Sequence, residues 1–413
     1  MSEPAKKPTG SMPGVQPESY QPQKPEMMRA LEQAQRQRQS ETTYPAAFTL
    51  PDRSTPRSPD ASHNCPGYVT FANEFAYFMD YAGEGYGFIE RNKGWRCDIN
   101  YTLADVVTGY AARPCCLDVT HDGLDRLYRA AGYSKRRTYY ADAEKGGYMS
   151  QAEMKRAIIR TLCELGQPVI LNPIENRFFG AVVIGYKDGG DTLVTFGYPP
   201  YFIAPDNTQP QIEEITDWYQ EKTALTIVGP REKPLPVKDL YLLGLRQIRD
   251  CLRAGIQGED RHYYDEWERF LRLKSMDEMM AEAKRRGTLP GGQMFWADQE
   301  KPIDHNILAG LADPTWCEAS ERRYYIMHFM HQMAQHFPDE KKALGALDTH
   351  FCKACEIMGN AKKGYISKVG HDPVNMKLFA KRSVRARMAR CVRKFRRADA
   401  KGLAVIERIL DKS

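Results

Sequence analysis

The sequence predicts an α+β fold, in which a small antiparallel sheet packed by helices is followed by an all-helical region. Three observations lead to this prediction. Short apolar runs bounded by Gly, Pro and polar residues recur between residues 169 and 228, which is typical of strands. The Gly-rich, acidic stretch 188–191 between two of these runs is typical of a hairpin turn. From Val237 onward, apolar residues recur every three or four positions, which is typical of helices.

The central unit of the predicted sheet region spans residues 149–198. Met154, Ile158 and Leu162 lie at i, i+4 and i+8, and therefore on one face of a helix. Gly166 ends this helix. The apolar runs that follow have the length and composition of strands, and they occupy residues 169–171, 179–186, 192–196 and 224–228.

A buried helix is predicted upstream of this unit, because Phe71, Phe75 and Phe78 lie on one helical face. Cys65 lies at or just before the N-terminus of this helix, where the helix dipole lowers the pKa of a thiol and favours the nucleophilic thiolate. The same position also suits a small buried residue, because cysteine is among the most buried residue types. Two further short helices are predicted at 101–112 and 122–131.

The chain of 413 residues is long enough for two domains. Residues 1–60 hold ten prolines and few apolar residues. They cannot bury enough surface to offset chain entropy, so we predict a disordered, Pro-rich N-terminal tail. The α+β domain is expected at 61–232, and a helical domain that ends in a basic amphipathic helix at 237–413.

Composition excludes several classes of protein. The hydrophobic share of 42% and the charged share of 27% are ordinary for a globular protein. No window approaches the roughly 18 consecutive apolar residues of a membrane span, and the N-terminus lacks the apolar core of a secretory signal. Ten cysteines without a regular spacing fit free thiols in a reducing compartment. We therefore expect a cytoplasmic protein, with its oligomeric state left open.

Three motifs occur in the order found in papain-like cysteine peptidases: Asn64-Cys65 before its helix, Gly166-Gln-Pro-Val-Ile170, and Ala181-Val-Val-Ile-Gly-Tyr186 before a Gly-rich hairpin. Over roughly residues 61–230 the chain resembles the bacteriocin-leader cysteine peptidase domains. It also resembles the N-terminal domains of butirosin-biosynthesis acyltransferases and their uncharacterised bacterial relatives, some of which carry similar helical tails. The resemblance implies a papain-like fold, with an N-terminal helix packed on a small antiparallel sheet.

Papain-like catalysis needs a thiolate, a histidine that moves the proton, and an Asp or Asn that orients the histidine. The resemblance implies Cys65 as the nucleophile. It places the histidine just before the strand that ends at Gly185, where this chain has Phe179, or Gly180 with a slip of one residue. Neither residue can move a proton.

The orienting acid is also missing from its expected place. In the family it closes the next strand, before a proline, and here Tyr198 precedes Pro199. His63 is two residues from Cys65, but closeness along the chain does not provide the facing geometry of a base. His121 begins a predicted helix and fits a cap or surface residue better. Two of the three catalytic roles are therefore vacant.

What the resemblance then implies is a cleft without proton-transfer groups and rimmed by aromatic side chains. Such a cleft suits a small apolar or aromatic ligand, or an extended peptide. The alternative is that the Phe178 and Phe179 rings fill the space of the missing imidazole as core residues. The predicted cleft residues are Asn64, Cys65, Tyr68, Trp95, Phe178, Phe179 and Tyr198.

Histidines at 328, 331, 336 and 350 precede a Cys352-Lys-Ala-Cys355 motif on a helical pattern. A zinc site needs four ligands, and neither a second Cys pair nor a His-Glu-x-x-His motif accompanies this one. We interpret these residues as ordinary helix-face histidines and buried thiols, and we expect neither a metal nor a cofactor.

The positive charge of the chain is concentrated near its C-terminus. The net charge is +6, yet residues 377–401 hold eleven Lys and Arg and one acid, so the rest of the chain is negative. A basic amphipathic helix over 374–410 either packs with a solvated basic face or binds nucleic acid, an anionic membrane surface or an acidic partner. Its predicted basic patch consists of Arg382, Arg385, Arg387, Arg390, Arg393, Arg396 and Arg397.

These patterns favour a non-catalytic papain-like protein that binds a small molecule or peptide in a degenerate cleft and acts as a sensor or adaptor. One alternative is a cysteine peptidase or acyltransferase that uses Cys65 with another base. The second alternative is a nucleic-acid-binding protein that uses the basic C-terminal helix.

Overall fold

The structure of the chain is a computed structural model. Contacts group it into two units, Met1–Pro45 and Ala46–Ser413, and every element below belongs to the second unit. The residues that the structure describes are 44–51, 70–86, 88–91, 95–113, 120–133, 135–172, 181–197, 211–286, 314–365 and 376–412.

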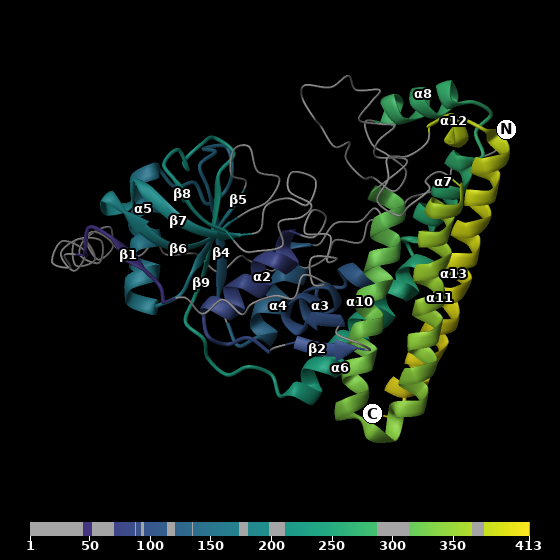
Figure 1. The fold of residues 1–413 in the computed structure, drawn as a ribbon, viewed down its shortest axis with the longest axis horizontal. Helices are drawn as coiled ribbons and strands as arrows, with labels where there is room; N and C mark the ends of the chain where they lie inside the picture. The colour runs from purple at the N-terminus through teal and green to yellow at the C-terminus, as the bar shows by residue number, and fades with distance from the viewer. Residues whose placement is uncertain are drawn as a thin grey trace, which may run out of the picture. The chain divides into compact units, whose positions relative to one another are not determined.

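One antiparallel sheet of seven strands organises the first half of this unit (Figure 1). The strand order is β4-β9-β5-β6-β7-β8, with the short β1 pairing with β6. The prediction of a mixed α+β chain with an antiparallel sheet and a helical C-terminal region is confirmed. The strands are β1 (Phe48–Thr49), β4 (Arg136–Tyr140), β5 (Val169–Asn172), β6 (Ala181–Lys187), β7 (Thr192–Gly197), β8 (Gln211–Ile215) and β9 (Ala224–Val228).

The turn predicted at 188–191 joins β6 to β7. It is a short 3-10 turn over Asp188–Gly190, and the two strands pair from Lys187 opposite Thr192. Asp188, Gly189 and Gly190 all have positive φ, a conformation that glycine adopts without strain and aspartate tolerates. The Gly-rich sequence therefore supplies the backbone conformation that the turn requires.

Strand β1 corrects the prediction that residues 1–60 form a disordered tail. Phe48 pairs with Tyr186, and Leu50 donates its backbone N–H to the Ile184 carbonyl and is buried. Gly185 allows this close approach, because a Cβ there would lie 2.5 Å from the Phe48 carbonyl oxygen. Phe48 and Leu50 therefore contact the sheet despite the Pro-rich composition around them.

Four helices accompany the sheet: α2 (Thr70–Tyr81), α3 (Ile99–Val107), α4 (His121–Ala130) and α5 (Gln151–Arg160). Helix α2 carries the predicted apolar face and lies against the sheet. The Tyr77 and Tyr81 rings pack edge-on against Phe196 of β7, with ring centroids 5.1 and 5.0 Å apart. Helix α5 continues as a π-helical turn (Thr161–Leu165) and ends at Gly166 with positive φ, as predicted.

Strands β4 and β8 and the hairpin of β2 (Phe88–Arg91) and β3 (Trp95–Asp98) were not predicted. Their sequences are rich in charged residues and lack a continuous apolar run. In β4, the side chains are only half-buried or exposed, so the hydrophobic signal on which the prediction rests is weak. Pairing with β9 along the full length of β4 supplies what the sequence pattern does not reveal.

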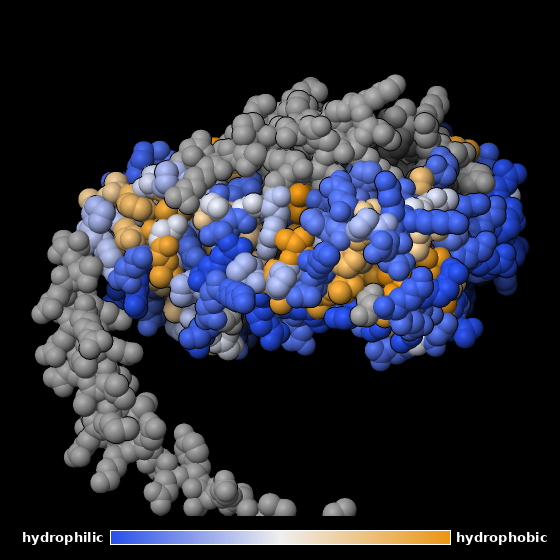
Figure 2. All heavy atoms as spheres, turned by 90° about the horizontal axis from the view of Figure 1, so that it is seen from below, coloured by the Kyte–Doolittle hydropathy of each residue, from blue (hydrophilic) through white to orange (hydrophobic). Residues whose placement is uncertain are grey.

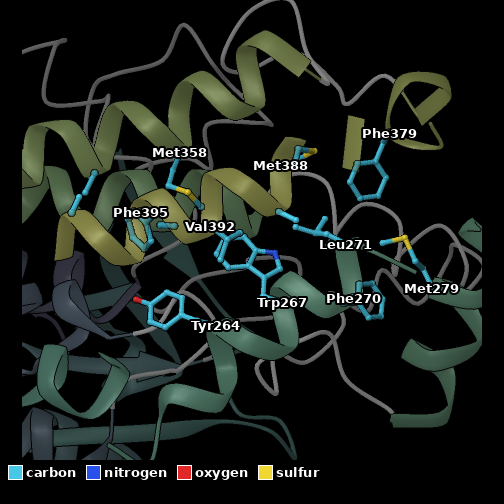
Figure 3. Packing of buried hydrophobic residues seen from close by; sticks show 14 of the residues in the cluster. Tyr264, Trp267, Phe270, Leu271, Met279, Met358, Phe379, Met388, Val392 and Phe395 are labelled. Atoms are coloured by element: carbon cyan, nitrogen blue, oxygen red, sulfur yellow. The ribbon is translucent and has the colours of Figure 1, made fainter. Parts of the chain in front are cut away.

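Beyond residue 237 the described elements are helical. They are α6 (Val237–Ile256), α7 (Arg261–Leu271), α8 (Met276–Arg286), α10 (Pro314–His336), α11 (Lys341–Tyr365), α12 (Met376–Phe379) and α13 (Arg382–Leu410). Helices α10, α11 and α13 run side by side (Figure 1). Figure 3 shows the core between α7, α11 and α13, where Trp267 and Phe395 lie among methionine and aliphatic side chains.

Helices α10 and α13 are tied to the first half of the unit by buried charge. Arg323 of α10 and Asp399 of α13 form an ion pair at 2.7 Å, and both side chains are fully buried. Arg323 also donates to the carbonyl oxygens of Ala111 and Ala112, in a 3-10 turn that follows α3. The contacts therefore cross the boundary expected near residues 232–237.

Hydrophilic residues cover most of the described surface in Figure 2, and the hydrophobic residues on that face lie in interrupted patches. Among the helices that the structure describes, none is both long enough and apolar enough to cross a membrane.

Candidate functional site

Most of the predicted cleft lies outside the described residues. This applies to Asn64, Cys65, Tyr68, Phe178, Phe179 and Tyr198. The backbone of Trp95 belongs to β3, and its side chain is not described. The role of Cys65 as a nucleophile therefore stays a prediction.

The described elements that border these residues meet at one edge of the sheet. Strand β5 ends at Asn172 and β6 begins at Ala181, and Leu171 pairs with Ala181. Strand β7 ends at Gly197, and Val182 pairs with Phe196. The ends of β5 and β7 and the start of β6, which border the segments outside the described residues, are thus neighbours in the sheet.

Helix α2, which begins five residues after Cys65, also reaches this edge. Its residue Glu74 forms a side-chain hydrogen bond with Asn172 at the end of β5. One turn and two turns later, Tyr77 and Tyr81 contact Phe196 at the end of β7. Helix α2, the end of β5, the start of β6 and the end of β7 therefore form one frame, which we call the sheet-edge site.

Glu74 is the described side chain in this frame that bears most on its chemistry. It is 9% exposed, and its Oε1 atom is buried without a hydrogen-bond partner among the described residues. Burial raises the pKa of Glu74 from 4.5 to about 7, while the Asn172 amide and the Arg136 guanidinium act in the opposite direction. An unpaired buried carboxyl oxygen is costly, and native proteins rarely retain one without a function or a bound partner.

A carboxyl with a pKa near 7 changes its chemistry around neutral pH. Below pH 7 it is protonated and can donate one hydrogen bond, and above pH 7 it is an acceptor for amide, hydroxyl or ammonium groups. Among the described side chains, no histidine comes from the half of the unit that precedes Val237, so none accompanies Glu74 as a proton carrier. The described part of the frame can therefore bind and orient a polar group.

The buried position of Glu74 could have been predicted from the sequence. Glu74 stands three residues after Phe71 and four before Phe78, and so belongs to the buried face of α2. Likewise, Asn172 directly follows the apolar run Val169–Leu171. A carboxylate inside an apolar helical face and an amide at the end of a buried strand both indicate polar groups that have been drawn into a core.

The seven arginines of the predicted basic patch fall into two groups. Arg385 is buried and donates to the carbonyl oxygens of Phe379 and Leu273, so it holds α12 and the end of α7 and does not face solvent. Arg396 pairs with Asp265, and Arg393 pairs with Glu268. Arg385 and Arg396 are used inside the helical region, whereas Arg382, Arg387, Arg390, Arg393 and Arg397 are exposed, Arg393 with its ion pair to Glu268.

The exposed group extends into a longer row than the sequence analysis named. Arg387, Arg390, Lys394, Arg397 and Lys401 are spaced by three or four residues and therefore lie on one face of α13. All five are exposed, and none has an ion-pair partner among the described residues. We call this row the α13 stripe. The buried face lies on the other side of the helix and contains both Arg385 and Asp399.

The described residues contain no group of three His, Cys, Asp or Glu side chains that could hold a metal ion. His328 is buried, and its ring packs edge-on against Tyr324 with centroids 4.2 Å apart. The Cys355 sulfur lies 3.2 Å from the Ser320 hydroxyl of α10, whereas the Cys352 sulfur lies 3.8 Å from Glu356 on its own helix. The two cysteines of the motif therefore have different neighbours.

In comparisons with known proteins, no protein family, curated protein or solved structure matches the chain, so the function is argued from the sequence and from the geometry above.

Proposed function

We propose that the chain is a papain-like protein that binds a small molecule or peptide at the sheet-edge site without catalysing its conversion, as a sensor or adaptor. The observation that carries the proposal is the meeting of α2, β5, β6 and β7 around a buried, incompletely bonded Glu74. This frame borders the segments that contain Cys65, Phe179 and Tyr198.

The topology supports a cleft at this position. In the papain-like arrangement, the nucleophile precedes a helix and the histidine precedes a strand that the helix faces. Here α2 packs on β6 and β7, and Phe179 stands two residues before β6 at the place of that histidine. Because phenylalanine moves no proton, the same geometry that would assemble a peptidase site favours binding.

The chemistry of the frame indicates which groups a ligand would present there. Tyr77 and Tyr81 pack with Phe196 in a buried aromatic cluster, and the Oε1 atom of Glu74 has no hydrogen-bond partner among the described residues. A ligand with an apolar or aromatic body and one amide or hydroxyl group would satisfy both. A short peptide fits this description because it carries both features in each residue.

The test uses the full chain and a library of neutral dansylated tripeptides that contain an aromatic residue. We expect saturable binding whose affinity changes with pH near pH 7. Glu74→Gln should lose this pH dependence, because it has no titratable side chain at position 74. Cys65→Ser is expected to leave peptide affinity and thermal stability near wild type, and peptide-coumarin substrates are expected to remain uncleaved.

Rapid, stoichiometric alkylation of Cys65 by iodoacetamide at neutral pH, with the other cysteines spared, would overturn the non-catalytic reading. That result would indicate an activated thiolate and favour a cysteine peptidase or acyltransferase. Wild-type and Glu74→Gln proteins that both fail to bind any peptide of the library would remove the peptide-binding proposal.

A second candidate function is the sequence-independent binding of duplex nucleic acid by the α13 stripe. Five cations without an ion-pair partner among the described residues span about 21 Å of helix, at 1.5 Å per residue, with no exposed acid between them on α13. A duplex offers a similarly linear array of phosphates. Insertion into a membrane surface requires an exposed apolar face, but the apolar face of α13 is buried against α7 and α11.

The signature of this second function is a steep salt dependence. If all five cations engage phosphates, the logarithm of the affinity falls against the logarithm of salt concentration with a slope of about −4. Arg390→Gln with Arg397→Gln should reduce the magnitude of that slope by about 2. Lys222→Gln with Arg246→Gln removes the same charge from exposed positions elsewhere and should leave the slope unchanged. Absence of retardation at low salt would remove this function.

A further inference from the structure

A separate pocket lies between the end of α4 and the start of β4. It has a volume of about 280 Å³ and is lined by Asp125, Arg129, Tyr133, Lys135, Arg136 and Arg137. Four of these six residues are cationic and one is acidic, so the lining carries a net charge of +3 at neutral pH. Charge of one sign around a concave surface focuses the field on its interior and attracts a ligand of the opposite sign.

Most of the cations in this lining form no ion pair with an acid among the described residues. Arg136 is largely buried and pairs with Asp125 at 3.0 Å, which accounts for one cation and the acid. Arg129, Lys135 and Arg137 are exposed and have no ion-pair partner among the described residues. The negative end of the α4 dipole explains a cation at Arg129, in the last turn of that helix. The helix dipole does not explain Lys135, which precedes β4, or Arg137, which lies in β4.

Tyr133 supplies a second, independent observation. Its side chain is fully buried, it lines the pocket, and its hydroxyl has no hydrogen-bond partner among the described residues. Burial raises the pKa of this hydroxyl, so it stays protonated and remains a donor at neutral pH. A tyrosine in the lining and three cations that all lack a partner among the described residues are an arrangement that an anion would complete.

The pocket is built on a fixed backbone. Gly132 has a φ of +98°, and a Cβ there would lie 2.8 Å from the Pro234 nitrogen. Arg231 donates to the Ala131 carbonyl at 2.9 Å and pairs with Glu84. The Tyr133 ring packs edge-on against Phe78, with centroids 5.2 Å apart. These contacts hold the aromatic ring in place, so a ligand would not have to order it.

From this geometry we propose that the α4–β4 pocket binds a phosphomonoester. Two exposed arginines provide planar donor pairs that match phosphate oxygens, Lys135 adds a point charge, and the Tyr133 hydroxyl donates to a further oxygen. The volume admits a phosphate group with a small substituent and excludes a much larger ligand. The proposal does not depend on ligand binding at the sheet-edge site.

The experiment titrates the full chain with glycerol 3-phosphate, with glycerol as the uncharged control, and measures heat of binding. We expect saturable binding that weakens at least tenfold in Arg129→Gln/Arg137→Gln, because charge-assisted hydrogen bonds to phosphate are lost. Lys222→Gln/Arg246→Gln removes equal charge from exposed positions on other elements and should leave the affinity within twofold of wild type.

Tyr133→Phe separates binding from folding. In a purely structural position, loss of an unpaired buried hydroxyl leaves the thermal midpoint unchanged or raised. We expect this together with at least a threefold loss of affinity for glycerol 3-phosphate. Undiminished affinity in Tyr133→Phe and in the double arginine variant would overturn the proposal, as would the absence of any saturable binding by the wild type.

A second arm identifies the source of the phosphate. Phosphatidic acid presents the same phosphomonoester on a membrane, so vesicles of phosphatidylcholine with and without phosphatidic acid are compared by cosedimentation. Binding of soluble glycerol 3-phosphate alone supports a free metabolite as the ligand. Binding that also requires Arg129 and Arg137 on the phosphatidic acid vesicles supports the same site with a lipid headgroup.

Discussion

Glu74 and Asp399 are both buried acids of this unit, and their surroundings differ. Asp399 of α13 accepts hydrogen bonds at both oxygens, from Arg323 at 2.9 and 2.7 Å and from the Tyr264 hydroxyl at 3.3 Å. Glu74 of α2 bonds Asn172, and its other oxygen has no partner among the described residues. Arg136, the cation that lowers the pKa of Glu74, is paired with Asp125.

The difference separates structural charge from charge that is available for binding. A buried ion pair with all its bonds made holds elements together, although its desolvation cost offsets much of its attraction. A buried carboxyl with one oxygen unpaired adds to the cost of folding, and that cost is offset only when another group reaches it. We therefore assign Asp399 to the architecture and Glu74 to the site.

The largest expected effect comes from breaking the complete pair. Arg323→Met leaves Asp399 buried without its cation and should lower the free energy of unfolding by about 3–5 kcal/mol in denaturant titrations. Arg323→Met with Asp399→Leu should recover most of this loss, because neither charge remains. A single variant within about 1 kcal/mol of wild type would show that the pair is not the tie described here.

The second effect concerns the incomplete site and depends on pH. The pKa of Glu74 is about 7 in the folded state, against an ordinary value of 4.5, so the folded state holds the proton more tightly than the unfolded state. This contribution to stability is present below pH 4.5 and is lost as the pH rises through 7, by about 3 kcal/mol in total.

Glu74→Gln mimics the protonated acid and removes this dependence. Its free energy of unfolding should match wild type near pH 4.5 and exceed it by up to about 3 kcal/mol at pH 8.5. The measurement is urea unfolding of both proteins across this range. Parallel pH profiles for the two proteins would contradict the assignment of a raised pKa to Glu74.

A smaller effect is expected when the remaining partner of Glu74 is removed. Asn172→Leu keeps the branched shape of the side chain but deletes the amide that stabilises the carboxylate, so the pKa of Glu74 should rise further. The loss of stability should be about 1–3 kcal/mol at pH 8.5 and smaller at pH 5, because a bond to a charged group is worth more than one to a neutral group. Equal losses at both pH values would show that Asn172 does not act through Glu74.

The smallest effect tests the redundancy of the complete network. Tyr264→Phe deletes the longest hydrogen bond to Asp399 and the 3.3 Å bond that the hydroxyl accepts from Arg323, and leaves both bonds from Arg323 to Asp399 in place. The free energy of unfolding should fall by about 0.5–1.5 kcal/mol, the usual value of one hydrogen bond. A loss as large as that of Arg323→Met would mean that the tyrosine, and not the ion pair, completes the network.

The fold could be predicted from the sequence where hydrophobic periodicity is strong. Strand β9 matches its predicted bounds, β5 and β7 exceed theirs by one residue, and Gly166 ends α5 with its π turn as expected. Strand β1 was missed because a Pro-rich composition outweighed a short apolar run. Strand β4 was missed because its residues gain their structure from pairing with β9, which no local pattern reveals.

The candidate site was less readable, for a different physical reason. A list of arginines does not show which of them face solvent, but spacing does: Arg385 and Asp399 share the face of Met388, Val392 and Phe395. In α2, the spacing of Phe71, Glu74 and Phe78 likewise puts Glu74 on the buried face of the helix. What spacing cannot supply is the partner of a buried group, because Asn172 lies 98 positions from Glu74 along the chain.

In the proposed papain-like cleft, Cys65 and Phe179 face the same space. Whether these two residues lie close together is therefore the most direct test of the proposal. Phe179→Cys is oxidised under mild conditions, and its disulfides are mapped by peptide mass. Asp188→Cys, at the opposite end of β6, is the control. A disulfide requires the two Cα atoms to come within about 7 Å. We predict a bond between residues 65 and 179 and none between 65 and 188, whereas the absence of the first bond, with residue 179 reactive to alkylation, would contradict the proposed papain-like cleft.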